Sequence, residues 1–124
     1  MHAVDHETFE ALVDEAIAAL PQGFRDRVDN VTFAVEDWVG PRDLGLTGTS
    51  SGTLLGVYRG VPLTRRSSGY NLATPDVVVI FQQPHQRMAR DAQHLRALVE
   101  HTVQHEVAHY FGISDDRLRE LGSY

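Results

Sequence analysis

The chain has 124 residues, of which 42% are hydrophobic, and this suits one domain with a single modest core over residues 1–124. The formal net charge of -6 argues against a nucleic-acid partner, and the lack of a run of about 18 apolar residues argues against a membrane span. Because the chain has no cysteine, His, Asp or Glu must bind any transition metal. The first residues lack the basic segment and apolar run of a signal peptide, so a cytoplasmic location is expected.

The first third of the chain predicts a helix and a strand. Apolar residues recur at three- and four-residue steps over Thr8–Leu20, which is the spacing of a helix with one buried stripe. Asp5 or Thr8 can cap the start of this helix, and Pro21 stops it. Val31–Glu36 alternates weakly and is rich in β-branched and aromatic residues, which indicates a first strand.

The middle of the chain predicts a loop and two further strands. Residues 40–52 contain four glycines without the lysine and following helix of a phosphate-binding loop, so a linker is expected there. Thr53–Tyr58 is interpreted as a second strand, and a polar, turn-rich stretch follows it. Asp76–Gln82 is a nearly continuous apolar run, typical of a strand buried on both faces, and Pro84 is expected to end it.

The last third predicts a long helix over about Arg90–Phe111 and a short one over about Ser114–Leu121. An apolar stripe on the long helix would pack on the sheet; its members are Leu95, Leu98, Val99, Thr102, Val103, Val107 and Ala108. The stretch from Tyr58 to Asp76 has too little helical pattern for a regular crossover between parallel strands. We therefore predict a small α/β (α+β) fold with a short mixed sheet.

A His-Glu-x-x-His string runs from His105 to His109 inside the long predicted helix. Histidines four residues apart project from the same face of a helix, about 6 Å apart along the axis, so both imidazoles can reach one metal ion. Glu106 points to one side of that face, where its carboxylate can hydrogen-bond a metal-bound water without ligating the metal. The string therefore predicts His105 and His109 as ligands.

The third ligand has to come from beyond the helix, because the next turn carries its side chains away from the ion. Gly112 can end the helix in a left-handed conformation at little steric cost, and Asp115 follows three residues later. Asp115 is the predicted third ligand, which leaves a coordination position for water, as catalytic zinc sites require. Asp116 is a rival that falls one residue outside the spacing. Such ligands also accept other divalent ions.

Ordinary structural roles are the alternative for all of these residues. His105 and His109 could be polar-face histidines, with the two aspartates capping the last short helix. His101 lies one turn before His105 on the same face, where an outer-shell or exposed role is expected. Four further histidines fit no ligand spacing and are predicted to lie on the surface: His2, His6, His85 and His94.

Three segments together resemble a family of small bacterial zincin-like metallopeptidases. They are Leu54–Ser67, Val77–Phe81 and His101–Leu118, and the last of them, with its His-Glu-x-x-His-x-x-Gly-x-x-Asp pattern, is highly specific. The resemblance implies a minimal zincin fold, with an active-site helix behind a short mixed sheet. It also implies zinc bound by His105, His109 and Asp115, with Glu106 as general base. The methionine-containing turn of the metzincins has no counterpart downstream of the motif.

The expected reaction is hydrolysis of a peptide or protein substrate by zinc-activated water. The peptide could pair with an exposed strand edge, for which either Thr53–Tyr58 or Val77–Phe81 could serve. Oxyanion donors stay open among five candidates; these are His101, Tyr110, Tyr58, Arg59 and Tyr70. The alternatives are a non-catalytic metal-binding or interaction module and a zinc-dependent RNA-processing hydrolase. The RNA-processing alternative is disfavoured for two reasons. The zinc motif of such hydrolases lacks a glutamate at the position of Glu106, and RNA would favour a basic groove over this acidic chain.

Overall fold

The computed structural model describes residues 1–28, 31–41, 54–60 and 76–113 of the chain. Three strands form one sheet in the order β1-β3-β2. β1 (Val31–Glu36) pairs in parallel with β3 (Asp76–Phe81), and β2 (Gly56–Arg59) pairs antiparallel to β3. The predicted mixed sheet is therefore confirmed. Of the two strands considered for the exposed edge, β2 lies at an edge of the described sheet. The other candidate, Val77–Phe81, is wrong, because it belongs to β3, the central strand.

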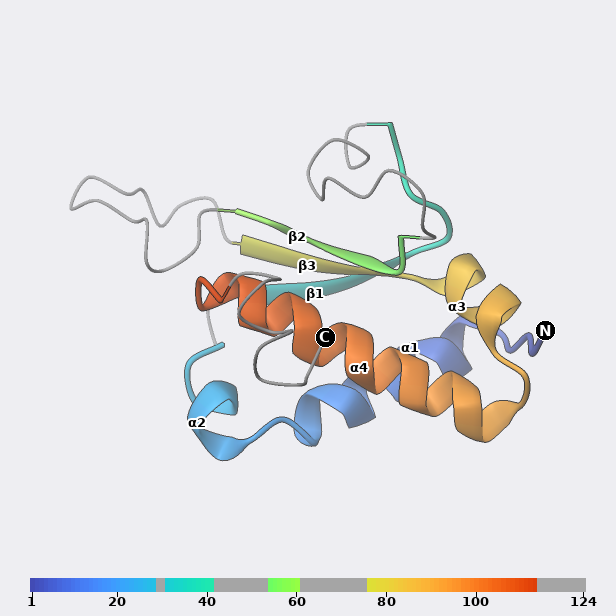
Figure 1. Ribbon diagram of the computed structural model, residues 1–124, viewed down its shortest axis with the longest axis horizontal. Coiled ribbons are helices and arrows are strands. Elements are labelled where there is room, and N and C mark those ends of the chain that lie inside the picture. Colours follow the sequence, from blue (N-terminus) through green and yellow to red (C-terminus); the bar gives the residue numbers. More distant parts are fainter. Residues whose placement is uncertain (29–30, 42–53, 61–75, 114–124) are drawn as a thin grey trace.

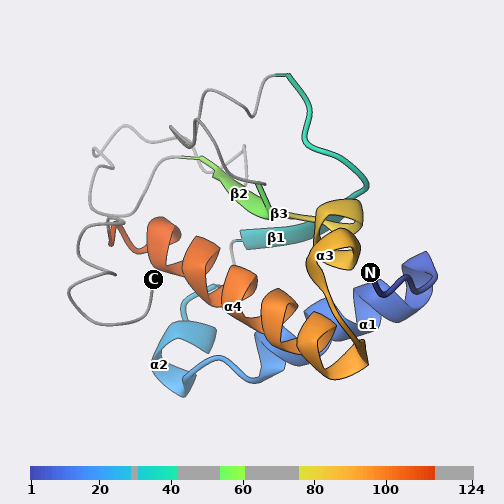
Figure 2. The same cartoon turned by 45° about the vertical axis from the view of Figure 1, so that its right-hand side comes forward.

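The helices α1 (His6–Ala18), α2 (Gln22–Arg25) and α4 (Ala92–Tyr110) lie on one side of the sheet, and α3 (Gln82–Met88) lies at the end of β3 (Figures 1 and 2). α4 packs between the sheet and α1. Part of the surface of the long helix therefore packs on β2 and β3, and another part packs on α1. No described helix combines the length and the apolar character that crossing a lipid bilayer requires.

Alternation along β3 divides the core between the two faces of the sheet. Val78 and Ile80 point toward the helices, and the partly buried Phe33 of β1 packs on the same core. Val79 and Phe81 point to the other face and form a second, smaller cluster there. The prediction of a strand buried on both faces is confirmed, since only Val77 on β3 retains partial exposure.

Two predicted helices agree with the structure apart from their ends. α1 begins at His6, and the Asp5 side chain accepts a hydrogen bond from the Thr8 amide at 2.7 Å, so Asp5 is the cap of the two candidates. α4 covers Ala92–Tyr110 and is capped by Asp91, which accepts from the His94 amide at 2.8 Å. The predicted buried stripe is confirmed except at Leu98, which is only partly buried.

The expected end of the third strand at Pro84 is wrong. β3 ends at Phe81, and α3 begins at once with Gln82, so Pro84 is the third residue of a helix. A proline is tolerated in a first turn because its missing N–H has no partner within the helix there. The second predicted strand begins at Gly56, three residues later than expected, and Thr53 and the predicted helix over Ser114–Leu121 lie outside the described residues.

Candidate metal centre

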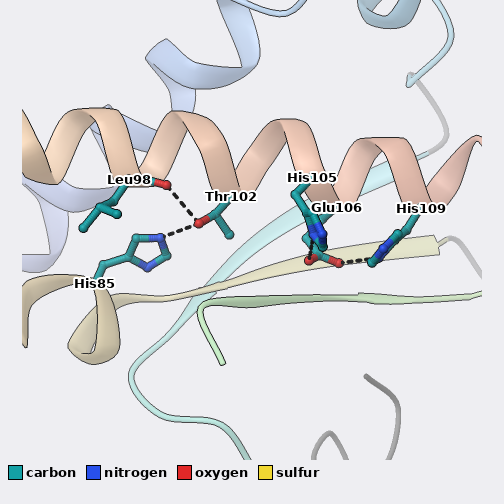
Figure 3. Close-up of polar contacts among 6 residues, drawn as sticks. All are labelled: His85, Leu98, Thr102, His105, Glu106 and His109. Carbon is teal, nitrogen blue, oxygen red and sulfur yellow. Dashed lines mark hydrogen bonds and ion pairs between the residues drawn. The ribbon is translucent and has the colours of Figure 1, made fainter. Parts of the chain in front are cut away.

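His105, Glu106 and His109 lie on the side of α4 that faces the strands (Figure 3). The His105 and His109 rings are 4.5 Å apart at an interplanar angle of 66°. His105 Nδ1 is 3.1 Å from Glu106 Oε2, and His109 Nδ1 is 3.3 Å from Glu106 Oε1. One helical turn therefore brings two imidazoles to the two oxygens of a single carboxylate.

The Glu106 side chain is buried, whereas the two histidines remain partly exposed. Burial alone would raise the pKa of the Glu106 carboxyl, but hydrogen bonds from His105 and His109 and their positive charge outweigh this effect. The net result is a pKa below the ordinary value for glutamate. Glu106 is consequently ionised at neutral pH, and its buried negative charge favours a cation beside it.

The three side chains fit a divalent metal ion by the chemistry and convergence of their donors. One ligand atom from each residue lies within 4.8 Å of those of the other two. Imidazole nitrogen and carboxylate oxygen are the donors that zinc uses in proteins when cysteine is absent. Among the described residues this is the one group of three or more such donors with this spacing.

α4 ends at a left-handed glycine, as expected from the glycine at position 112. Gly112 has a φ of 82°, and its amide bonds the His109 carbonyl at 2.9 Å. The Ile113 amide bonds the Ala108 carbonyl at the same distance, which completes a Schellman motif. The predicted left-handed residue is therefore confirmed. Asp115, the predicted third ligand, and its rival Asp116 lie outside the described residues.

The oxyanion candidates occupy different surroundings. His101 is exposed, and its ring lies 6.3 Å from that of His105 in a stacked arrangement. The Tyr58 hydroxyl donates to Asp76 Oδ2 at 2.6 Å, and the Tyr58 ring packs edge-on against Tyr110 at 5.8 Å. Arg59 contacts the carboxylate of Glu36 at 3.4 Å; Tyr70 lies outside the described residues.

The prediction that His85 lies on the surface is wrong. Its side chain has no exposed area, and its ring packs edge-on against Phe9 at 5.6 Å. Nδ1 lies 2.7 Å from the Phe81 carbonyl oxygen, and Nε2 lies 2.8 Å from the Thr102 hydroxyl (Figure 3). His85 is polar but buried because α3, which carries it, packs against α4. The sequence pattern did not predict α3. The remaining three histidines, His2, His6 and His94, are exposed or partly exposed.

Sequence reasoning also missed Gly56, which faces this site from β2. A Cβ atom at Gly56 would lie 2.7 Å from Thr102 Cγ2 and 3.4 Å from Glu106 Cγ. A glycine inside a strand pattern is a recognised signal that another part of the chain approaches closely. That signal was present in the sequence, but the partner that approaches can be identified only from the tertiary structure.

Comparisons with known proteins agree with this geometry. Residues 28–123 match the zincin-like metallopeptidase family. A conserved hypothetical protein from Thermus thermophilus has a similar fold, with a TM-score of 0.56 and 21% identity over 95% of this chain and 97% of its own. No curated protein matches the chain. Since the family match covers most of the chain and includes the His-Glu-x-x-His helix, the protein belongs to the family of zincin-like metallopeptidases.

Proposed function

We propose that the protein is a zinc-dependent metallopeptidase that hydrolyses peptide bonds with Glu106 as general base. The observation that carries this proposal is the convergence of His105, Glu106 and His109, whose donor atoms lie within 4.8 Å of one another on the sheet-facing side of α4. Membership of the zincin-like family supports the choice of zinc and of peptide hydrolysis.

His105 and His109 would bind the zinc ion, and Asp115, three residues beyond the turn at Gly112, would supply the third ligand. Bound there, zinc lowers the pKa of water and polarises a substrate carbonyl. The turn itself supports this assignment, because a left-handed glycine ends the helix three residues after the second histidine.

Glu106 is suited to accept a proton because it is ionised at neutral pH and shielded from solvent. It would take a proton from the attacking water as the water oxygen bonds to the carbonyl carbon of the substrate. The same carboxyl group would then return the proton to the amine nitrogen as the carbon–nitrogen bond breaks. The neighbouring imidazoles hold the carboxylate through contacts of 3.1 and 3.3 Å.

The proposed substrate is an extended segment of a peptide or protein. β2 lies at the edge of the sheet, and Gly56 on this strand lies against Thr102 and Glu106 of α4. A substrate strand that paired with the edge of β2 would run past Glu106 and the two histidines. This arrangement would align the scissile bond with the metal site.

Glu106→Gln tests the reaction and the metal site separately. The variant should bind one zinc ion per chain, as the wild type does, and should lose peptide hydrolysis by at least about 100-fold, the range of general-base catalysis. Metal content by elemental analysis and cleavage of a broad peptide library, with and without a chelator, are the two measurements. Glu100→Gln on the same helix is the matched control and should retain activity. Activity that survives in Glu106→Gln, or a wild type without stoichiometric zinc, would refute the proposal.

A further inference from the structure

Thr102 shares one face of α4 with the proposed metal site. Positions 102, 105, 106 and 109 are separated by three, four and seven residues, which places their side chains on one side of a helix. Figure 3 shows Thr102, His105, Glu106 and His109 all on the lower side of α4, toward the strands. Any rotation of α4 about its axis therefore moves Thr102 and the metal-site side chains together.

The hydroxyl of Thr102 is held by α3. It lies 2.8 Å from His85 Nε2 and 2.9 Å from the Leu98 carbonyl oxygen. The Phe81 carbonyl can only accept, so Nδ1 of His85 carries the ring proton at the 2.7 Å contact. Nε2 of neutral His85 can then only accept, so the single hydroxyl proton of Thr102 is shared between Nε2 and the Leu98 carbonyl oxygen. This hydrogen bond connects the start of α3 to the middle of α4.

The methyl group of Thr102 is held by β2. A Cβ atom at Gly56 would lie 2.7 Å from Thr102 Cγ2 and 3.0 Å from the Val79 carbonyl oxygen. Both separations are shorter than ordinary van der Waals contacts. A side chain at this position would push β2 away from α4 through Thr102 and would also press on the backbone of β3 at Val79. Gly56 is not among the described glycines with positive φ, which are Gly60 and Gly112. The close approach of α4 and of the Val79 carbonyl on β3, and not the backbone conformation, therefore accounts for glycine here.

We propose that Thr102 and Gly56 are positioning residues for the metal site: the threonine is held between His85 and the bare backbone of Gly56, and this contact sets the rotation of α4 and its distance from β2. The same contact determines how closely Glu106 approaches the edge strand, because Glu106 Cγ lies 3.4 Å from the Cβ position of Gly56. The inference rests on the proposed function only in that it takes His105 and His109 as metal ligands.

The first test is Gly56→Ala, with Co²⁺ and Zn²⁺ as probes. Displacement of α4 should weaken binding of either ion by about tenfold or more, as loss of a supporting contact typically does, and should shift the visible absorption bands of bound Co²⁺. Gly23→Ala is the matched control, because a Cβ atom at Gly23 meets no atom within 4 Å. It should leave both the affinity and the spectrum unchanged.

Removing the obstructing methyl group gives a rescue experiment. Gly56→Ala combined with Thr102→Ser should recover part of the Co²⁺ affinity and return the spectrum toward that of the wild type, since serine keeps the hydroxyl and lacks Cγ2, while the contact with the Val79 carbonyl remains. A purely structural role would lower the melting temperature but would leave the spectrum of the folded protein unchanged. Circular dichroism and thermal unfolding of every variant separate the two effects.

Thr102→Val keeps the inference testable if Gly56→Ala does not fold. Valine retains the methyl contact with Gly56 and removes the hydroxyl that His85 binds, so affinity for Co²⁺ should fall about fivefold, the ratio that one neutral hydrogen bond supports. Folded Gly56→Ala and Thr102→Val variants with the wild-type spectrum and affinity would overturn the positioning role and leave the proposed function standing. A wild type that binds neither ion would overturn both.

Discussion

Glu106 combines two properties that seldom occur together, burial and a pKa below the ordinary value. Burial of a carboxyl group normally favours its neutral form. Here His105 and His109 contact both carboxylate oxygens and reverse that tendency. The spacing of the three residues on one helix thus accounts for the ionised state of Glu106, while the packing of α4 on the sheet shields its carboxylate from solvent.

The third ligand is a prediction that single substitutions can test. Asp115→Ala should weaken zinc binding by roughly 100-fold or more, because removal of even an outer-shell partner typically costs 10- to 100-fold. Asp116→Ala is the control and should bind zinc as the wild type does. Competition with a chromophoric chelator measures both affinities. If Asp116→Ala loses the metal and Asp115→Ala retains it, the assignment of the two aspartates must be exchanged.

His85 predicts a specific dependence of stability on pH. Burial lowers its pKa from 6.5 to about 4, although the contacts with backbone oxygens oppose this shift. The folded state binds the proton more weakly than the unfolded state. The contribution of neutral His85 to the free energy of unfolding is therefore fully present above pH 6.5 and is lost as the pH decreases toward 4. The loss attributable to this residue is about 3 kcal/mol, at about 1.36 kcal/mol per pH unit.

Urea unfolding of the wild type and His85→Gln between pH 7.5 and pH 4 measures this contribution. The variant should be less stable at pH 7.5 because it loses the imidazole contacts, but its free energy of unfolding should decline less over this range. His94→Gln, at a partly exposed position, is the control and should follow the wild type. Parallel curves for wild type and His85→Gln would contradict the predicted role.

At the scale of elements, the stability of α4 depends on the capping of its first turn. The Asp91 side chain accepts from the His94 amide at 2.8 Å and so satisfies a donor that has no partner within the helix. Asp91→Ala should lower the free energy of unfolding by about 1 kcal/mol. Thermal unfolding compared with Asp14→Ala, at an exposed position within α1, measures the effect. Equal losses in the two variants would show that the cap contributes nothing.

α3 shows why some elements escaped prediction. Four of its seven residues are buried, and they are Gln82, Pro84, His85 and Gln86. Three of these four are polar, so the usual apolar periodicity is missing. Gln82 and Gln86 hydrogen-bond one another and the N-terminal segment at Val4. Polar side chains can therefore fill the interior of this small helix, because partners distant in sequence satisfy them.

At the scale of the whole molecule, Phe9 joins α1 to the core that supports the candidate metal site. It has no exposed area and packs on His85, whereas Phe24 is 37% exposed. Phe9→Ala should reduce the free energy of unfolding by about 3–5 kcal/mol, the range for truncation of a buried phenylalanine. Phe24→Ala should cost clearly less, because less area is buried there. Urea unfolding compares the two, and an equal loss would contradict the assigned core.

The sequence by itself determined the elements whose evidence is local. The elements that follow from side-chain periodicity within one segment are β1 with its bounds, the buried run of β3 and the long helix, on which His105 and His109 share one face. The left-handed turn at Gly112 also follows locally, because only the end of the helix and a glycine are needed. The mixed character of the sheet followed from the missing helical pattern before Asp76.

Only the tertiary structure decided which segments meet. It made β2 an edge and β3 the centre, buried His85 against Thr102, and brought Gly56 against α4. The physical reason is that each of these contacts joins residues far apart in the sequence. The energy of such a contact depends on the packing of the whole core, and no periodicity within a single segment encodes it.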